Sequence, residues 1–160
     1  MVLYECRYTS PLGDLRLLAD EEALRGIWFV GQKYEAAGIA GEIIQKANPI
    51  LEATQAWLTA YFAGQEPLFS LPLAPVGTDF QQRVWQALLA IPYGQTVTYG
   101  QLAHQLGVKS SQAVGGAVGR NPFSIVIPCH RVLGAKGQLT GYAGGLDKKI
   151  WLLRHEGLEL

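Results

Sequence analysis

The sequence predicts an α+β protein of two units, a small antiparallel sheet with a helix over residues 1–76 and a mostly helical unit over residues 77–160. Strand-like segments gather before residue 30, whereas helix-capping patterns gather after residue 77. Three prolines between Pro67 and Gly77 separate the two regions, which is typical of a domain boundary. With 160 residues, of which 49% are hydrophobic, the chain has enough apolar surface for packed cores.

The first unit is expected to begin with three short strands separated by turn-forming residues. These strands are Val2–Tyr8, Leu12–Ala19 and Leu24–Phe29. Short connections of this kind join neighbouring antiparallel strands, so the segments predict a meander. Pro49 then opens a pattern of apolar residues at helical spacing, which Gly64 closes. We expect this helix to cover one face of the sheet.

The helices of the second unit are predicted by their caps. Thr78–Gln81 and Thr98–Gln101 both fit the capping box, in which a Thr side chain and a Gln side chain satisfy each other's backbone groups. The first box predicts a helix that ends before Pro92, and the second predicts one that ends at Gly107. Ser110 is placed to cap a third helix, over residues 111–119.

The second and third of these helices, joined by a tight turn, have the form of a helix-turn-helix. Ordinary helix packing produces the same pattern, so the motif alone leaves nucleic-acid binding and simple packing both open. Charge adds an argument, because residues 1–76 carry a net charge of −4 and residues 77–160 one of +4, although the chain as a whole is neutral. A polyanion would therefore prefer the second unit.

The cysteine pattern and the hydropathy indicate the compartment in which the protein works and the partners that it lacks. Cys6 and Cys129 lie far apart, and neither has the spacing of a zinc site or belongs to a disulfide framework. No signal peptide and no apolar run of transmembrane length is present. We expect a cytoplasmic monomer that has no membrane partner and binds neither a metal nor a cofactor.

Cys129 is the candidate nucleophile. The run Phe123–Ile127 predicts a buried strand, which places Cys129 at the end of that strand. A free thiol has a pKa of about 8.5, so a neighbouring base must take its proton. His130 is next in sequence, but neighbours in an extended segment point to opposite faces, so their contact needs a turn or a bridging water. Many free cysteines are only small buried hydrophobes, which is our interpretation of Cys6.

The residues around Cys129 match a known pattern. The run Ile127–Val132, Ile-Pro-Cys-His-Arg-Val, resembles the active-site signature of the O6-alkylguanine-DNA alkyltransferases. Further segments that resemble the family are Ser10–Gly13, Tyr61–Gly64, Tyr99–Ala103, Ala113–Gly115, Asn121–Pro122, Gly141–Gly145 and Trp151–Gly157. The resemblance implies a ribonuclease-H-like first domain without a nuclease role. It also implies a second domain that binds DNA and holds the alkyl acceptor.

By this resemblance the protein repairs DNA without a cofactor. It would transfer a methyl or other alkyl group from O6 of guanine, and from O4 of thymine, irreversibly and once to Cys129. Glu156, His130 and a water would generate the thiolate, because a carboxylate fixes the imidazole tautomer and the imidazole accepts the thiol proton. Tyr142 would donate to the departing guanine. The base must first be flipped out of double-stranded DNA, at a cost of a few kcal/mol.

The resemblance also implies how DNA is held, with the helix-turn-helix in the minor groove. Tyr99 would press on the phosphate of the extruded nucleotide, and Asn121 would join the recognition helix to the cysteine segment. Gln112 stands where most members have the arginine that fills the gap left by the base. The other positions expected to contact DNA or substrate are Ala113, Gly115, Arg120, Val132 and Ala143. Lys109 and Arg131 are candidates for phosphate contacts or for structural pairing.

Two other functions fit part of the sequence. Some relatives of the family bind alkylated DNA without catalysis because they have lost the cysteine, whereas Cys129 is present here. A cysteine hydrolase would share the Cys/His chemistry but would turn over, and it would leave the helix-turn-helix unexplained. The chain also lacks the Cys and His set with which some relatives bind zinc, and it has Ala143 where some carry a hydroxyl.

Overall fold

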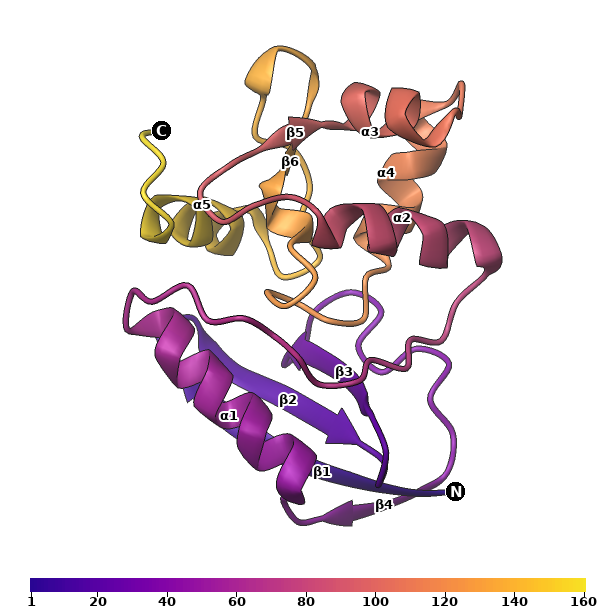
Figure 1. Ribbon diagram of the computed structural model, residues 1–160, viewed down its shortest axis with the longest axis vertical. Helices are drawn as coiled ribbons and strands as arrows, with labels where there is room; N and C mark the ends of the chain where they lie inside the picture. The colour runs from indigo at the N-terminus through magenta and orange to yellow at the C-terminus, as the bar shows by residue number, and fades with distance from the viewer. The chain divides into compact units, whose positions relative to one another are not determined.

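The computed structural model describes residues 1–160, which form two compact units, Met1–Val76 and Gly77–Leu160 (Figure 1). Strands dominate the first unit and helices the second, so the α+β class predicted from the sequence is confirmed. No helix combines the length and the apolar character that crossing a membrane requires. Nowhere do three or more His, Cys, Asp or Glu side chains come together so that they could hold a metal ion.

The first unit is built on a four-stranded sheet in the order β3-β2-β1-β4. The predicted antiparallel meander is confirmed, and its strands are β1 (Val2–Ser10), β2 (Gly13–Ala19) and β3 (Leu24–Phe29). The fourth strand, β4 (Glu42–Gln45), pairs with β1 in parallel, so the sheet is mixed and not purely antiparallel. The strand β4 is not predicted from the sequence because it is short and exposed at every position, without the alternation that marks a half-buried strand.

One helix, α1 (Pro49–Phe62), packs on β1 and β2, as Figure 1 shows. Asn48 caps it by accepting a hydrogen bond from the Leu51 backbone amide, and proline is favoured in the first turn. Its buried face carries Leu51, Thr54, Leu58 and Tyr61. The helix predicted between Pro49 and Gly64 is therefore confirmed.

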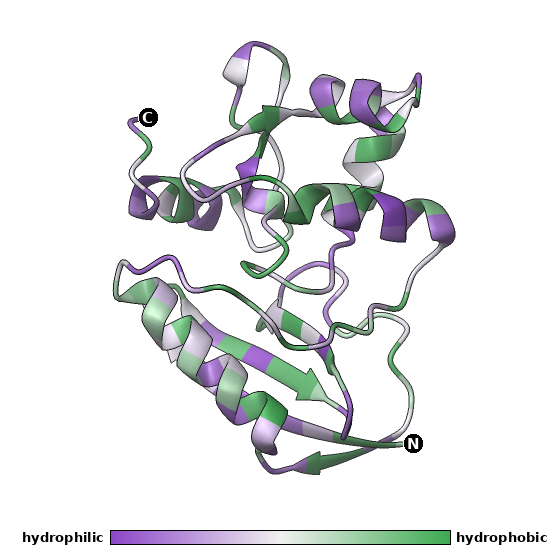
Figure 2. Ribbon diagram, in the orientation of Figure 1, coloured by the Kyte–Doolittle hydropathy of each residue, from purple (hydrophilic) through white to green (hydrophobic).

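The second unit contains α2 (Asp79–Leu89), α3 (Tyr99–Leu106), α4 (Ser111–Gly119) and α5 (Leu146–His155). Both capping boxes are present as predicted, with Thr78 and Thr98 each bonded reciprocally to the glutamine three residues later. Gly107 ends α3 in the left-handed conformation, at φ 69°, where glycine avoids the strain of a side chain. In Figure 2, hydrophilic and hydrophobic bands alternate along α2, in keeping with an amphipathic helix that packs on α3 and α4.

The segment Phe123–Ile127 is not a strand, contrary to the prediction. All of its residues are buried, but the backbone turns twice. The Val126 amide donates to the Ser124 carbonyl at 2.9 Å and the Ile127 amide donates to the Phe123 carbonyl at 3.0 Å. Ile125 lies between them with φ 73°, a conformation that β-branched residues rarely adopt. The prediction failed because a short apolar run indicates burial and does not by itself indicate an extended backbone.

Two short elements position the cysteine. Cys129–Arg131 forms a single 3₁₀ turn, η1, so Cys129 begins a turn and does not end a strand. The strand β6 (Val132–Leu133) follows at once and pairs in parallel with β5 (Val97–Thr98), directly before α3. A second turn, η2 (Ala135–Gly137), begins the loop that leads to α5. This arrangement joins the cysteine turn to the helix pair α3 and α4.

Candidate active site at Cys129

The backbone before Cys129 is held by the side chain of Asn121, which is buried. Its amide nitrogen donates to the carbonyls of Ile127 at 2.8 Å and Phe123 at 3.3 Å, while its oxygen accepts from the Phe123 amide at 2.9 Å. The Asn121 side chain also acts to lower the pKa of the Cys129 thiol. Asn121 follows directly on Arg120, the C-cap of α4, so it connects that helix to the cysteine.

His130 is fully buried, and its two ring nitrogens have different surroundings. Nε2 donates to Glu156 Oε2 at 2.6 Å, because an ionised carboxylate can only accept. Nδ1 is equally buried and has no hydrogen-bond partner in the protein. The 3₁₀ turn removes the constraint expected for an extended chain, in which His130 and Cys129 would point to opposite faces. Nδ1 is therefore the nitrogen with a free lone pair.

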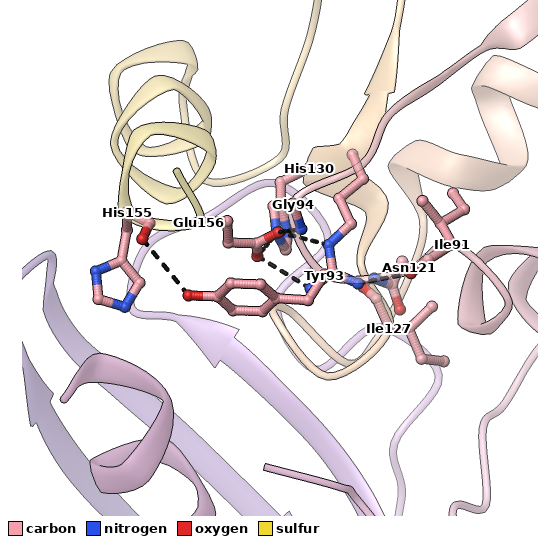
Figure 3. A network of polar contacts seen from close by, with 9 residues as sticks. Ile91, Tyr93, Gly94, Asn121, Ile127, His130, His155 and Glu156 are labelled. Carbon is pink, nitrogen blue, oxygen red and sulfur yellow. Dashed lines mark hydrogen bonds and ion pairs between the residues drawn. The ribbon is translucent and has the colours of Figure 1, made fainter. Parts of the chain in front are cut away.

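Glu156, at the C-cap of α5, is the centre of the polar network in Figure 3. Besides His130, it accepts from Arg131 Nε at 2.7 Å and Nη2 at 3.1 Å, and from the Gly94 amide at 3.1 Å. Its side chain is completely buried. Although it lies at the end of a helix, Glu156 is therefore shielded from solvent.

Arg131 belongs to this network. Besides its two bonds to Glu156, it donates through Nη1 to the Ile91 carbonyl at 2.7 Å. Its guanidinium lies 5.7 Å from the centre of the Tyr93 ring, within the range of a cation–π contact. Tyr93 in turn donates to the His155 carbonyl at 3.5 Å, which ties the loop after α2 to the end of α5 (Figure 3). The structural pairing expected for Arg131 is therefore present.

Burial sets the protonation of the cysteine and the histidine. It raises the pKa of the Cys129 thiol, although hydrogen bonding from Asn121 and the positive charge of Lys149 act to lower that pKa. Burial also lowers the pKa of His130, and the contact with Glu156 opposes that shift only in part. At neutral pH the resting site therefore holds a thiol beside a neutral imidazole, a nucleophile in its acid form beside a base in its basic form.

Lys149, in α5, is a site residue that the sequence analysis missed. It is fully buried, and its ammonium donates to the carbonyls of Val132 at 2.6 Å, Thr140 at 2.6 Å and Gly141 at 3.2 Å. Burial lowers its pKa to about 8, against an opposing contribution from Cys129. No sequence pattern marks a lysine that binds three carbonyls, and its neighbour Lys148 differs from it only in placement.

Two tyrosines lie near Cys129, one that precedes it in the sequence and one that follows it. The Tyr142 hydroxyl is buried, and the Ser124 and Thr140 side chains act to lower the pKa values of Tyr142 and Tyr99, respectively. Burial raises the pKa of both phenols, that of Tyr142 well above 10, and the negative charge of the thiolate adds to both shifts. The Lys149 ammonium lies 6.0 Å from the centre of the Tyr99 ring. Both phenols therefore keep their protons at neutral pH.

The remaining predicted site residues differ in their exposure to solvent. Gln112 and Ala113 in α4 and Arg120 at its C-cap are exposed, as is Lys109 in the turn before α4. Gly115 is partly buried, and a Cβ there would lie 3.7 Å from the Tyr99 ring. Ala143 is partly exposed, whereas Val132 is fully buried. The structure thus gathers Asn121, His130, Glu156 and both tyrosines with Cys129, and leaves an exposed face on α4.

Two family models together match nearly the whole chain. The model described as 6-O-methylguanine DNA methyltransferase, ribonuclease-like domain, matches residues 3–75. The one described as 6-O-methylguanine DNA methyltransferase, DNA binding domain, matches residues 79–158. The first match covers the sheet with α1, and the second covers every residue of the site at Cys129.

Individual proteins give the same result. The chain is 46% identical to the methylated-DNA–protein-cysteine methyltransferase of Methanosarcina acetivorans, over 97% of this chain and 99% of the relative. It is also 46% identical to the protein of that name from Salmonella typhimurium, over 97% and 96%. Among solved structures, the Mycobacterium tuberculosis OGT in complex with DNA matches with a TM-score of 0.85 and 42% identity, over 96% of this chain and 92% of that one.

Proposed function

The chain belongs to the O6-methylguanine-DNA methyltransferase family, and from this premise we propose that Cys129 is the residue that accepts the alkyl group. The protein is a methylated-DNA–protein-cysteine methyltransferase that repairs DNA by transferring alkyl groups to itself. The observation that carries the assignment to Cys129 is the buried thiol beside a neutral imidazole, which is held in turn by a buried carboxylate.

The first chemical step is removal of the thiol proton. Glu156 keeps the proton of His130 on Nε2, so Nδ1 accepts the one from sulfur, through a bridging water. The imidazolium that forms is stabilised by the adjacent carboxylate. Arg131 and the Gly94 amide hold this carboxylate in place with three hydrogen bonds. The network therefore orients the base before DNA arrives.

The thiolate is stabilised by two groups that are already in position. The buried ammonium of Lys149 and the side chain of Asn121 both lower the pKa of the thiol and so favour the charged form of the sulfur. In a site shielded from water, such preorganised groups act more strongly than they do in solvent. The sulfur lone pair then attacks the alkyl carbon, and the carbon–oxygen bond breaks with its electrons passing to the guanine. The thioether that remains explains why the protein acts once.

The departing guanine carries negative charge, and Tyr142 is the proposed group that meets it. Because its pKa lies well above 10, the phenol keeps its proton and stabilises the base by donating a hydrogen bond. The base takes its new proton from water, and His130 returns the proton of the thiol to solvent, so charge is conserved. The Ala143 amide is a second donor placed to bind O6.

DNA binding is assigned to the second unit, residues 77–160, with the first unit as its companion domain. We propose that the protein acts as a cytoplasmic monomer on double-stranded DNA containing O6-alkylguanine or O4-alkylthymine. The exposed face of α4, with Ala113 and Arg120, enters the minor groove, while Tyr99 presses on the phosphate of the flipped nucleotide. Because Cys129 is only 7% exposed, the loop that carries Tyr142 must move away from Cys129 when the base enters the site.

Gln112 is expected to limit base flipping. It is exposed on α4, and it is shorter than arginine and uncharged, so it fills the gap in the duplex less well and neutralises no phosphate. Changing Gln112→Arg should raise the rate of repair of duplex DNA about three- to tenfold at subsaturating DNA and fixed salt. Gln65→Arg adds the same charge to an exposed position of the first unit and serves as the control. A rate that does not rise in Gln112→Arg, or rises equally in the control, contradicts the prediction.

One stoichiometric incubation tests the proposed function. The protein is mixed with an equimolar duplex that contains one O6-methylguanine, and the intact protein is then weighed and mapped by peptide mass spectrometry. We expect the mass of one methyl group on Cys129, and no gain in Cys129→Ala, which should still bind the duplex.

Each alternative gives its own result in this experiment. Unchanged mass with retained binding would make the protein a non-catalytic binder of damaged DNA. Repair beyond one equivalent would indicate a turnover enzyme such as a hydrolase. A methyl group on Cys6 would overturn the assignment of Cys129. Methylation of Cys6 is not expected, because Cys6 lies on β1 and its thiol pKa is raised by burial and by Glu5.

A further inference from the structure

We propose that Trp85 is a positioning residue for alkyl transfer, whose indole N–H fixes the end of helix α4 and thereby holds Asn121 and the cysteine turn in place. This inference rests on the proposed function and adds to it a residue of α2 that lies outside the network of His130 and Glu156. Because Trp85 is only 2% exposed, it acts through other residues and not by touching the DNA.

The indole of Trp85 reaches a carbonyl in the last turn of α4. Its Nε1 donates to the Ala117 carbonyl at 2.9 Å, a buried bond between two helices. The last four carbonyls of a helix have no partner within the helix, so they need donors from elsewhere. The Ala117 carbonyl also accepts from the Arg120 amide at 3.2 Å, where the helix ends. Helix α2 therefore supplies a side-chain cap to α4.

Packing restrains α4 only weakly along its own axis. The buried residues of this helix are Val114, Ala117 and Val118. Such short side chains interdigitate little with α2 and α3, so they restrict sliding less than large side chains do. A hydrogen bond depends on distance and direction, and the bond from Trp85 therefore defines where α4 lies. The indole ring is confined in turn, since a Cβ at Gly77 would overlap it.

The end of α4 is connected to Cys129 by further hydrogen bonds. The Asn121 amide donates to the Val118 carbonyl at 3.2 Å, which keeps Asn121 attached to the last turn of the helix. The Asn121 side chain donates to the Ile127 carbonyl at 2.8 Å, and this carbonyl also accepts from the Cys129 amide at 2.8 Å. The same helix carries the proposed DNA-binding face. The bond from Trp85 therefore links the docking of DNA to the placement of the thiol.

Trp85→Phe tests the inference, because it removes the N–H and keeps an aromatic ring. The control is Trp57→Phe, which removes an indole N–H that donates to the Pro67 carbonyl at 3.0 Å in the first unit. The first-turnover rate is measured with saturating O6-methylguanine duplex, and the Kd for the duplex and the Tm are measured separately. We expect Trp85→Phe to slow transfer about five- to tenfold and to change Kd less than about twofold. Trp57→Phe should lower the Tm and keep the natural rate.

An isosteric replacement separates the hydrogen bond from the volume of the ring. Benzothienylalanine in place of Trp85 keeps the shape of the indole and has sulfur where the N–H was. It should slow transfer as much as Trp85→Phe does. The natural rate in this variant would overturn the inference, because only the bulk of the ring would then matter.

A double-mutant cycle with Asn121→Ala tests the route through Asn121. If Trp85 acts through Asn121, then Trp85→Phe should cause no further slowing in the Asn121→Ala background. A merely structural role would slow both backgrounds equally. That result, or equal slowing by Trp57→Phe, would overturn the inference while alkyl transfer to Cys129 stands. Absence of methylated Cys129 in the natural protein would instead overturn the proposed function.

Discussion

Replacing Glu156 by glutamine should slow alkyl transfer by at least about 100-fold, the usual effect of losing a positioned acid–base group. The carboxylate accepts four hydrogen bonds, from His130, twice from Arg131 and from the Gly94 amide. A glutamine oxygen could serve only part of this set, and its NH₂ group would face other donors. His130 would then lose the partner that fixes its tautomer and stabilises its charged form.

The variant should also be less stable, because removing one partner of a buried ion pair leaves the Arg131 charge uncompensated, at a cost of about 3–5 kcal/mol. Glu159→Gln, an exposed position three residues later, is the matched control and should change neither property. Urea unfolding measures the free energy of unfolding, and single-turnover kinetics on methylated duplex measure transfer. A Glu156→Gln protein that transfers at the natural rate would exclude His130 as the base.

The pH dependence separates catalysis from folding in that variant. Burial lowers the pKa of His130 and Glu156 opposes the shift, so loss of the carboxylate should lower this pKa further. His130 acts as a base only when neutral, so transfer in the natural protein should decline as pH falls through the pKa of the folded state. In Glu156→Gln that decline should move to lower pH while the plateau falls. An unmoved decline would show that another group is titrating.

Replacing Lys149 by methionine is expected to have the second large effect. Three carbonyls, those of Val132, Thr140 and Gly141, would lose their common donor. Buried acceptors left without a partner cost about 1–3 kcal/mol each, partly offset because no charge remains buried, so a net loss of about 2–4 kcal/mol is expected. Transfer should also slow at least about tenfold, since the thiolate loses the positive charge that lowers the pKa of the thiol.

Lys148→Met changes the preceding residue of the same helix, which is less buried, and is the control for charge and helix propensity. The Tm of each variant and its single-turnover rate are the measurements. Equal losses in the two variants would contradict the role given to Lys149, and so would an unchanged rate in a folded Lys149→Met protein.

Titration of Lys149 also gives a stability test. Its pKa in the folded protein is about 8, below the usual 10.5, so between these values the unfolded chain binds more protons. The free energy of unfolding therefore gains from this residue as pH rises through that window. In the Cys129→Ala background, which removes the titration of the thiol, this gain should disappear when Lys149 is replaced by Met.

Local patterns were sufficient to predict most of the fold. The capping boxes at Thr78 and Thr98 depend on residues only three positions apart, and the structure forms both. The meander and α1 likewise follow from alternation and helical spacing within short segments. The strand predicted for Phe123–Ile127 was wrong. This segment is apolar because it is buried on every side, and an apolar run does not indicate that the chain turns. Such a turn is imposed by Asn121, and so by contacts outside the run.

The sequence by itself determined the fold class, the helices α1 to α4, the caps at Thr78, Thr98 and Ser110, and the residue types of a thiol nucleophile, an imidazole and a carboxylate. These depend on neighbours along the chain or on motifs, and both are visible in the order of residues. Only the tertiary structure decided that Glu156 binds Arg131 as well as His130, and that Lys149 binds three carbonyls. Burial, donor geometry and pKa depend on groups far apart in sequence, and the low-dielectric interior where they meet exists only in the folded chain.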